Sequence, residues 1–197
     1  MIHRVFANQP SFHVIEFTSG LNVVLAERKD SASQKDTRNS LGKSTLIEII
    51  DFCLGSRVTT GEGLCIETLQ EWEFGVEITL SGNKVQATRT IKTPNRIIIN
   101  GPTAGWNHQP EYDAKEGEHT FNLETWKALL GWALFGLMPV ETPIRYKPSF
   151  RSLLSYFIRR GVDAYTDPFR HFRLQQPWDI QLHNAFLLGL NWENAAK

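Results

Sequence analysis

The stretch at residues 36–45 reads Asp-Thr-Arg-Asn-Ser-Leu-Gly-Lys-Ser-Thr, and the rest of the chain is interpreted around it. It lies between an apolar run at residues 21–25, typical of a strand, and an apolar run at residues 46–54, typical of a helix. A strand, a loop, Gly-Lys-Ser/Thr and a helix in this order indicate a phosphate-binding P-loop. The main-chain N–H groups of such a loop and the dipole of the following helix both favour a bound phosphate.

The side chains of this stretch predict the contacts of a nucleotide site. Lys43 is expected to reach the β and γ phosphates of ATP, and the Ser44 hydroxyl is expected to bind Mg²⁺. The predicted nucleotide-binding residues are Arg38, Asn39, Ser40, Leu41, Gly42, Lys43, Ser44 and Thr45. Thr37 stands where the full motif has its first glycine, so an ordinary helix N-terminus with a solvated lysine is the alternative.

Composition places the chain among ordinary globular proteins. Its 197 residues suffice for one sizeable domain or one lobe of a larger one, and its 21 basic residues balance its 21 acidic residues. No overall positive field therefore indicates nucleic acid. The two cysteines, Cys53 and Cys65, make neither a disulfide framework nor a zinc site, and Cys53 falls in an apolar run. Without a signal peptide or an 18-residue apolar run, the sequence predicts a cytoplasmic protein that does not cross a membrane.

Around the motif, alternating and helical patterns predict the neighbouring elements. Residues 2–6 and 12–17 favour an antiparallel strand pair, followed by a buried central strand at residues 21–25. The polar insertion at residues 26–35 is either functional or, as we favour, a solvated flexible insertion. The helix at residues 46–54 is apolar nearly all round and should be buried, with Gly55 as its stop.

The middle of the chain predicts an antiparallel meander. Its strands are expected at residues 74–80, 84–91 and 96–100, because each alternates in polarity and turn sequences at residues 81–83 and 93–95 join them. Residues 80–83 read Leu-Ser-Gly-Asn and resemble the Leu-Ser-Gly-Gly signature of ABC-type ATPases. A signature opens a helix, whereas this run is placed at a hairpin tip, so we reject the match. Residues 101–120 are polar and predict a loop.

The remainder predicts mainly helices. They are expected at residues 123–137, 150–158 and 180–190, with a short strand at residues 144–146. The loop at residues 162–177 is aromatic and basic. It either touches a phosphate backbone with aromatic support or is a surface loop anchored by its aromatic rings, which we favour. The residues concerned are Phe169, Arg170, His171, Phe172 and Arg173.

Two parts of a complete ATPase are missing from the sequence. A Walker B strand, four apolar residues followed by Asp and usually Glu, is not found, and neither is a signature helix. The chain by itself is therefore expected to bind a nucleotide without hydrolysing it efficiently.

Several motifs together resemble the ATPase heads of the SMC, RecN and RecF type, which are relatives of the ABC ATPases. Residues 12–24, Phe-His-Val-Ile-Glu-Phe-x-x-Gly-Leu-Asn-Val-Val, are similar to the opening of these heads. Asn39 and Gly42-Lys43-Ser44 match the family loop, and residues 50–55 match the end of its helix. Thr37, Ser40 and the insertion depart from the family pattern. The likeness is strongest to the SMC-like subfamily of bacterial three-component ABC-type systems, whose members carry similar helices at residues 150–160 and 185–190.

This resemblance implies how the chain would work. It would be the N-terminal half of a head, followed by a coiled coil and by a C-terminal half that brings the signature and Walker B. Two heads, as a homodimer, would enclose ATP and Mg²⁺, and the whole would act on DNA in repair or defence with accessory system proteins. A glutamine between the two subdomains of these heads binds Mg²⁺, and Gln176 is the candidate for it, with Gln175 beside it.

The sequence thus predicts an α/β protein, a P-loop NTPase of the ABC/SMC head type, with a mixed sheet, an antiparallel β-lobe and a C-terminal helical subdomain. Residues 1–140 would form the nucleotide-binding lobe and residues 141–197 the helical subdomain. Two alternatives stay open: another P-loop enzyme, such as a small kinase or GTPase, and a non-enzymatic interaction module with a degenerate loop. The guanine-reading Asn-Lys-x-Asp motif of a GTPase is not found.

Overall fold

A computed structural model describes residues 1–25, 43–59, 61–138, 147–160 and 165–194. The chain divides into two compact units, Met1–Leu123 and Glu124–Lys197. The boundary that the sequence predicted at residue 140 lies outside the described residues. A helix with the length and apolar character needed to cross a membrane is not found in the part of the chain that the structure describes.

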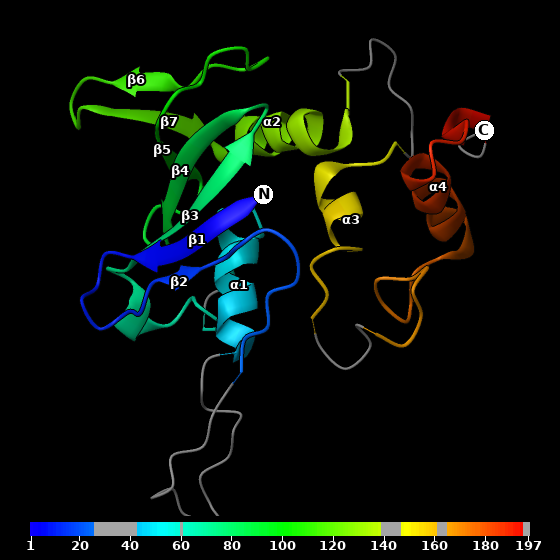
Figure 1. Ribbon diagram of the computed structural model, residues 1–197, viewed down its shortest axis with the longest axis horizontal. Helices are drawn as coiled ribbons and strands as arrows, with labels where there is room; N and C mark the ends of the chain where they lie inside the picture. The colour runs from blue at the N-terminus through cyan, green and yellow to red at the C-terminus, as the bar shows by residue number, and fades with distance from the viewer. Residues whose placement is uncertain (26–42, 60, 139–146, 161–164, 195–197) are drawn as a thin grey trace, which may run out of the picture. The chain divides into compact units, whose positions relative to one another are not determined.

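The N-terminal unit is built on one seven-stranded sheet (Figure 1). Its strands follow the order β2-β1-β3-β4-β5-β7-β6, and every pairing among the described residues is antiparallel. The strands are β1 (Ile2–Ala7), β2 (Ile15–Glu16), β3 (Glu73–Leu80), β4 (Asn83–Thr90), β5 (Arg96–Asn100), β6 (Glu111–Asp113) and β7 (Glu118–Asn122), with the 3-10 helix η2 (Glu67–Leu69) before β3.

This sheet contradicts the predicted fold class. A P-loop NTPase head has a mixed sheet with parallel strands, whereas the strands described here pair only in antiparallel fashion. The predicted central strand at residues 21–25 is not a strand, and the side chains of Leu21 and Leu25 are 90% and 74% exposed. The apolar run misled the prediction because a buried parallel strand also needs neighbouring strands, and none of the described strands pairs with it.

The predicted antiparallel pair and the predicted meander are confirmed. Strands β1 and β2 pair at Val5 and Ile15, and β3, β4 and β5 follow one another across the sheet. Ser81 and Gly82 connect β3 and β4 with φ angles of 47° and 82°. Two successive positive φ values are typical of the type I′ hairpin turn, which matches the right-handed twist of the strands. The Leu-Ser-Gly-Asn run is therefore a hairpin tip, as predicted.

The two faces of the sheet differ in polarity. On β3, the alternate side chains Phe74, Val76, Ile78 and Leu80 are buried. The opposite face carries Glu77, whose carboxylate lies 3.0 Å from Arg4 Nε and 2.6 Å from Lys84 Nζ. The hydrogen bond from Lys84 is the main cause that lowers the pKa of Glu77. Such alternation is typical of an antiparallel sheet with one face packed and one face solvated.

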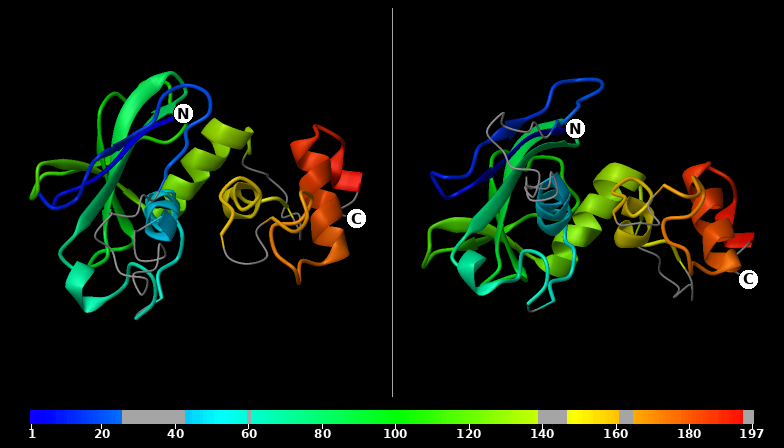
Figure 2. Two further views of the ribbon diagram at one scale, coloured as in Figure 1. Left: turned by 60° about the horizontal axis from the view of Figure 1, so that its bottom comes forward. Right: turned by 90° about the horizontal axis from the view of Figure 1, so that it is seen from below.

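Helix α1 (Lys43–Cys53) lies along the apolar face of the sheet (Figure 2). It contacts β3, β4 and β1. Gly55, with φ of 91°, ends it: the N–H of Gly55 donates to Phe52 O and the N–H of Ser56 to Asp51 O, which together form a Schellman motif. The predicted buried helix and its glycine stop are confirmed.

Strands β6 and β7 replace part of the loop predicted at residues 101–120. Strand β7 pairs with β5, where Phe121 lies opposite Ile97, and β6 pairs with β7 at the edge. Within β6 and β7, Phe121 is the one buried residue. The other side chains of these two strands are at least partly exposed, which accounts for their polar composition. Trp106 stacks on Phe121 with ring centroids 6.3 Å apart and fixes the connection that precedes them.

The C-terminal unit is helical. Its elements are α2 (Leu123–Phe135), which begins at the last residue of the first unit, α3 (Phe150–Leu154), α4 (Pro177–Leu187) and the 3-10 helix η3 (Trp192–Asn194). All three predicted α-helices are confirmed, although α3 is shorter than expected and α4 begins earlier, at a proline suited to the first helical turn. Phe135 packs on Phe150, with ring centroids 6.1 Å apart. The predicted strand at residues 144–146 lies outside the described residues.

Candidate functional site

Helix α1 begins at the lysine of the Gly-Lys-Ser-Thr run. Lys43 is its first residue, and the side chains of Ser44 and Thr45 are exposed in its first turn. That turn carries no acidic side chain. The first N–H groups of a helix lack intrahelical partners and point outward, so this end of α1 is electrostatically suited to an anion. The other predicted site residues, Arg38 to Gly42, lie outside the described residues.

Packing on the sheet fixes the position of α1. Leu46, Ile49, Phe52 and Cys53 are buried, at the helical spacing that places them on one side. The Phe52 ring meets the Phe74 ring of β3 edge to face, with centroids 6.3 Å apart. Aromatic pairs of this geometry add to the stabilisation from burial. The N-terminus of α1 is thus carried by a rigid element.

The opposite end of α1 is held by Arg89 of β4, which is 1% exposed. Its Nη1 donates to Phe52 O at 2.6 Å and to Ser56 O at 2.8 Å, and its Nε donates to Pro94 O. The guanidinium carbon also lies 4.2 Å from the centroid of the Phe52 ring. A cation at a helix C-terminus satisfies the last carbonyls and complements the helix dipole. Arg89 therefore anchors the helix whose other end carries Lys43.

Cys53 is inert in the folded protein. Burial raises the pKa of its thiol to about 12, against the smaller opposing effect of Arg89, and its Sγ contacts Phe74 O at 3.4 Å. Since the thiolate is the reactive form, we expect a maleimide at neutral pH to label the half-buried Cys65 in the folded chain and Cys53 only after unfolding. Mass spectrometry of labelled peptides measures this, with Cys65→Ser as the control that leaves Cys53 alone.

The same burial predicts a pH dependence. The unfolded thiol loses its proton near its ordinary pKa of 9.0, whereas the folded thiol keeps its proton up to about 12. The contribution of Cys53 to stability is therefore complete below pH 9 and falls as the pH rises from there. Rapid labelling of Cys53 in the native state would contradict the expected protection, and the same alkaline loss of stability in a Cys53→Ala variant would contradict the expected pH dependence.

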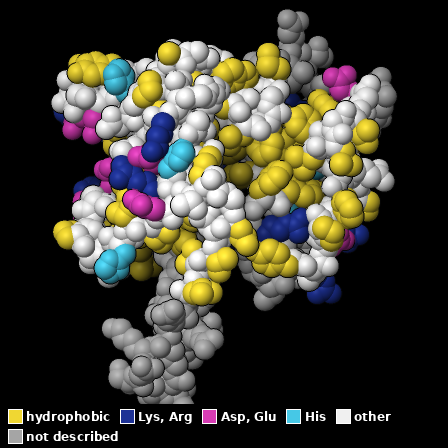
Figure 3. Space-filling model, viewed as in Figure 1, with side chains coloured by type: hydrophobic (Ala, Val, Ile, Leu, Met, Phe, Trp, Pro, Cys, Tyr) yellow, Lys and Arg dark blue, Asp and Glu magenta, His cyan; other side chains and the backbone are white. Residues whose placement is uncertain are grey.

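The segment that leads toward the phosphate loop presents apolar side chains. Val23 and Val24 are 67% and 47% exposed, like their neighbours Leu21 and Leu25. Asn22 closes a local turn before them, because its Oδ1 accepts from the N–H of Thr18 and its Nδ2 donates to Thr18 O. Figure 3 shows hydrophobic side chains at the surface beside the grey segment that begins after residue 25.

The two candidate glutamines have different surroundings. Gln176 is exposed at the N-cap of α4, and its Nε2 donates to Leu174 O at 3.4 Å. Gln175 is buried, and its Nε2 donates to Tyr156 OH and to an oxygen of Asp179, both at 2.8 Å. The exposed amide of Gln176 can turn toward a ligand. The amide of Gln175 cannot do so without losing its hydrogen bonds to Tyr156 and Asp179. The role of Gln176 in binding Mg²⁺ stays a prediction.

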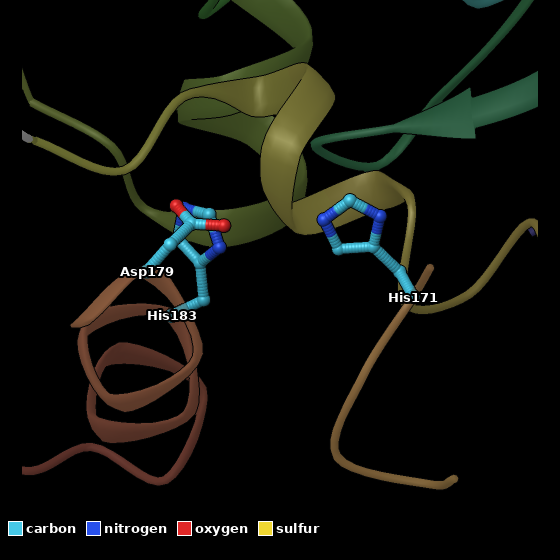
Figure 4. Close-up of side chains that lie close together, drawn as sticks. All are labelled: His171, Asp179 and His183. Carbon is cyan, nitrogen blue, oxygen red and sulfur yellow. The ribbon is translucent and has the colours of Figure 1, made fainter. Parts of the chain in front are cut away.

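A cluster that the sequence analysis did not identify lies next to Gln175. The side chains of His171, Asp179 and His183 each offer one donor atom, and these atoms all lie within 4.8 Å of one another (Figure 4). Two of the residues come from α4 and the third from the loop before it. The Asp-x-x-x-His spacing was the available signal, because residues four apart share one face of a helix, but Asp179 lay one residue before the expected start of the last helix. His171 could not be assigned to it, since loop geometry is not readable from spacing.

Comparison with known proteins gives limited guidance. No profile of a known protein family matches the chain. One similar protein is the "uncharacterized protein YydD" of Bacillus subtilis (strain 168), which is 29% identical over 154 residues. The match covers 75% of this chain and 23% of that protein. The chain therefore spans about a quarter of the length of the relative that it matches.

Proposed function

We propose that this chain binds ATP with Mg²⁺ at the N-terminus of α1, as the N-terminal portion of an SMC-like ATPase. The observation that carries the proposal is that α1 begins at Lys43, with exposed Ser44 and Thr45 and no acidic side chain in its first turn. Lys43 would bind the β and γ phosphates and Ser44 would hold Mg²⁺, which neutralises phosphate charge when it is bound. The predicted mixed sheet is not part of this proposal.

Hydrolysis would require a second half of the protein. The sequence offers neither Walker B nor a signature helix, and the similar Bacillus protein is about four times as long as the matched region. The exposed apolar run at residues 21–25 is suited to pairing with a further strand, as a C-terminal half would supply. By the family resemblance, we also propose a homodimer of heads in the cytoplasm, acting on DNA with accessory proteins.

The test is a titration of labelled ATP and Mg²⁺ onto the chain and onto Lys43→Ala. We expect the substitution to weaken binding by roughly 10- to 150-fold, the equivalent of about 1.5–3 kcal/mol for hydrogen bonds to a charged group. Lys115→Ala removes one exposed charge far along the same unit and should leave the affinity unchanged. Phosphate release measured in the same samples should stay near background.

Other outcomes favour the alternatives. Equal affinity of the chain and of Lys43→Ala, or no binding by the unmodified chain, contradicts the proposal and favours a non-enzymatic module with a degenerate loop. Preference for GTP, or fast turnover that depends on Lys43, favours another P-loop enzyme.

A further inference from the structure

We propose that His171, Asp179 and His183 form a binding site for a divalent transition-metal ion such as Zn²⁺. Asp179 and His183 lie one turn apart on α4, and His171 faces them from the loop that precedes this helix (Figure 4). All three belong to the C-terminal unit. The site is independent of the nucleotide proposal, since no residue of the phosphate loop takes part in it.

One of the separations between the donor atoms already fits the ligand geometry of a bound zinc ion. Zinc binds nitrogen and oxygen ligands at about 2.0–2.2 Å, so two ligands of a tetrahedral ion lie roughly 3.3–3.5 Å apart. Asp179 Oδ1 and His183 Nε2 are 3.3 Å apart and already have this separation. Within the cluster no donor pair exceeds 4.8 Å, so His171 has to approach by about 1.5 Å at most. His171 is half-buried in a loop, where such a movement requires no change in a helix.

Gln175 lies against all three residues, and its Nε2 is 3.5 Å from His183 Nδ1. Its Nε2 donates to Asp179 Oδ2, which leaves Oδ1 facing His183, and its Oε1 accepts from the main-chain N–H of His171 at 3.1 Å. Its Nε2 also donates to Tyr156 OH, and the Tyr156 ring meets both imidazoles edge to face, with centroids 5.2 Å from His171 and 6.0 Å from His183. Outer residues that hydrogen-bond and fix the ligands are a regular part of protein metal sites.

Charge and ligand type favour a transition metal over Mg²⁺ or Ca²⁺. His171 and His183 each offer one ring nitrogen to the cluster, and a neutral imidazole nitrogen is the commonest metal ligand in proteins. The Asp179 carboxylate supplies negative charge. The nearby cation Arg159 is engaged, since it donates to the main-chain oxygens of Tyr156, Asp167 and Pro168. Two imidazoles and one carboxylate suit zinc, cobalt and nickel, whereas Mg²⁺ and Ca²⁺ prefer oxygen ligands.

Binding of a metal ion would fix the loop that carries His171 against α4. An ion shared by His171 and α4 ties residues 165–176 to the helix and leaves its remaining coordination position to water or to a further ligand. Binding to the folded state alone raises its stability by mass action. At a hundredfold excess over the dissociation constant, we expect the unfolding transition of this unit to shift by roughly 10 °C or more.

The experiment uses the full chain, stripped of metal with a chelator and then dialysed. Zn²⁺ is titrated by calorimetry, and Co²⁺ by the visible absorption that tetrahedral cobalt shows. We expect one ion per chain, and a loss of affinity of about a hundredfold or more in His183→Ala, His171→Ala and Asp179→Asn, since even outer-residue changes cost 10- to 100-fold. His13→Ala, at an exposed histidine of the other unit, is the matched control and should bind normally.

Folding and binding are separated by the choice of variants. His183 is buried and its removal can unfold the unit, so circular dichroism is recorded for each variant, and the half-buried His171 gives the decisive comparison. Absence of stoichiometric binding, affinity that is unchanged in folded His171→Ala, or tighter binding of Mg²⁺ than of Zn²⁺ would overturn the proposal. The cluster would then only help to hold the preceding loop against α4 through the hydrogen bonds of Gln175 to His171 and Asp179.

Discussion

Replacing Arg89 by methionine is expected to lower the free energy of unfolding of the N-terminal unit by about 3–5 kcal/mol. Arg89 is buried, and methionine keeps much of its volume but donates no hydrogen bond. The carbonyl of Phe52 would lose its charged donor in a buried place, and those of Ser56 and Pro94 in partly buried places, at a cost of about 1–3 kcal/mol for each buried group left unsatisfied. The loss of the cation above the Phe52 ring adds to this effect.

Urea unfolding followed by circular dichroism measures this change. Arg96→Met is the matched control, because Arg96 on the neighbouring strand β5 pairs with Asp113 and Glu118 in a partly exposed position. Exposed pairs contribute about 0–1 kcal/mol, so the control should change stability little. If the two variants lose stability equally, Arg89 does not anchor α1.

Replacing Phe74 by alanine is expected to cost about 3–5 kcal/mol, as is usual for large aromatic residues in a core. The Phe74 ring touches Phe52 of α1 as well as Phe12 and Trp72, with centroid distances of 6.3, 6.4 and 5.7 Å. Alanine leaves a cavity where the helix meets the sheet, and the surrounding rings can fill it only in part.

Two controls define the interpretation of Phe74→Ala. Phe74→Leu keeps an apolar side chain and should cost about 1.5 kcal/mol or less. Tyr112→Ala removes an exposed ring from the edge strand β6 and should have a small effect. The measurement is again the midpoint of urea unfolding. A cost for Phe74→Ala no larger than that for Tyr112→Ala would mean that this aromatic cluster is not the junction between α1 and the sheet.

Local patterns predicted the elements whose stability is mainly local. Gly55 marked the end of α1, and Ser81-Gly82 marked a two-residue hairpin, because positive φ angles there require residues that tolerate them. The meander followed from alternating polarity, since one face of an antiparallel sheet is packed and the other is solvated. Helix α4 followed from its apolar spacing, although its start at Pro177 was missed by three residues.

Sequence patterns gave wrong predictions where the structure of a segment depends on the strand that it pairs with. The apolar run at residues 21–25 was predicted to be a central strand, but a strand exists only with a neighbour, and its side chains are exposed here. Strand β6 and the start of β7 fall within the loop that was predicted at residues 101–120. They were missed because the hydrogen bonds of β7 depend on pairing with β5, and only Phe121 marks β7 as packed. The predicted mixed sheet was wrong for the same reason, since the direction of pairing is not encoded in the apolarity of one strand.

The sequence by itself determined the buried helix that follows Lys43 and its end at Gly55, the hairpin between β3 and β4, and the helices of the C-terminal unit, because these depend on turn residues and on spacing along a few residues. Only the tertiary structure decided that the sheet is antiparallel throughout its described strands, that Arg89 reaches the far end of α1, and that His171 meets Asp179 and His183. Each of these joins residues on separate elements, and their proximity arises from packing of apolar surfaces rather than from any local pattern.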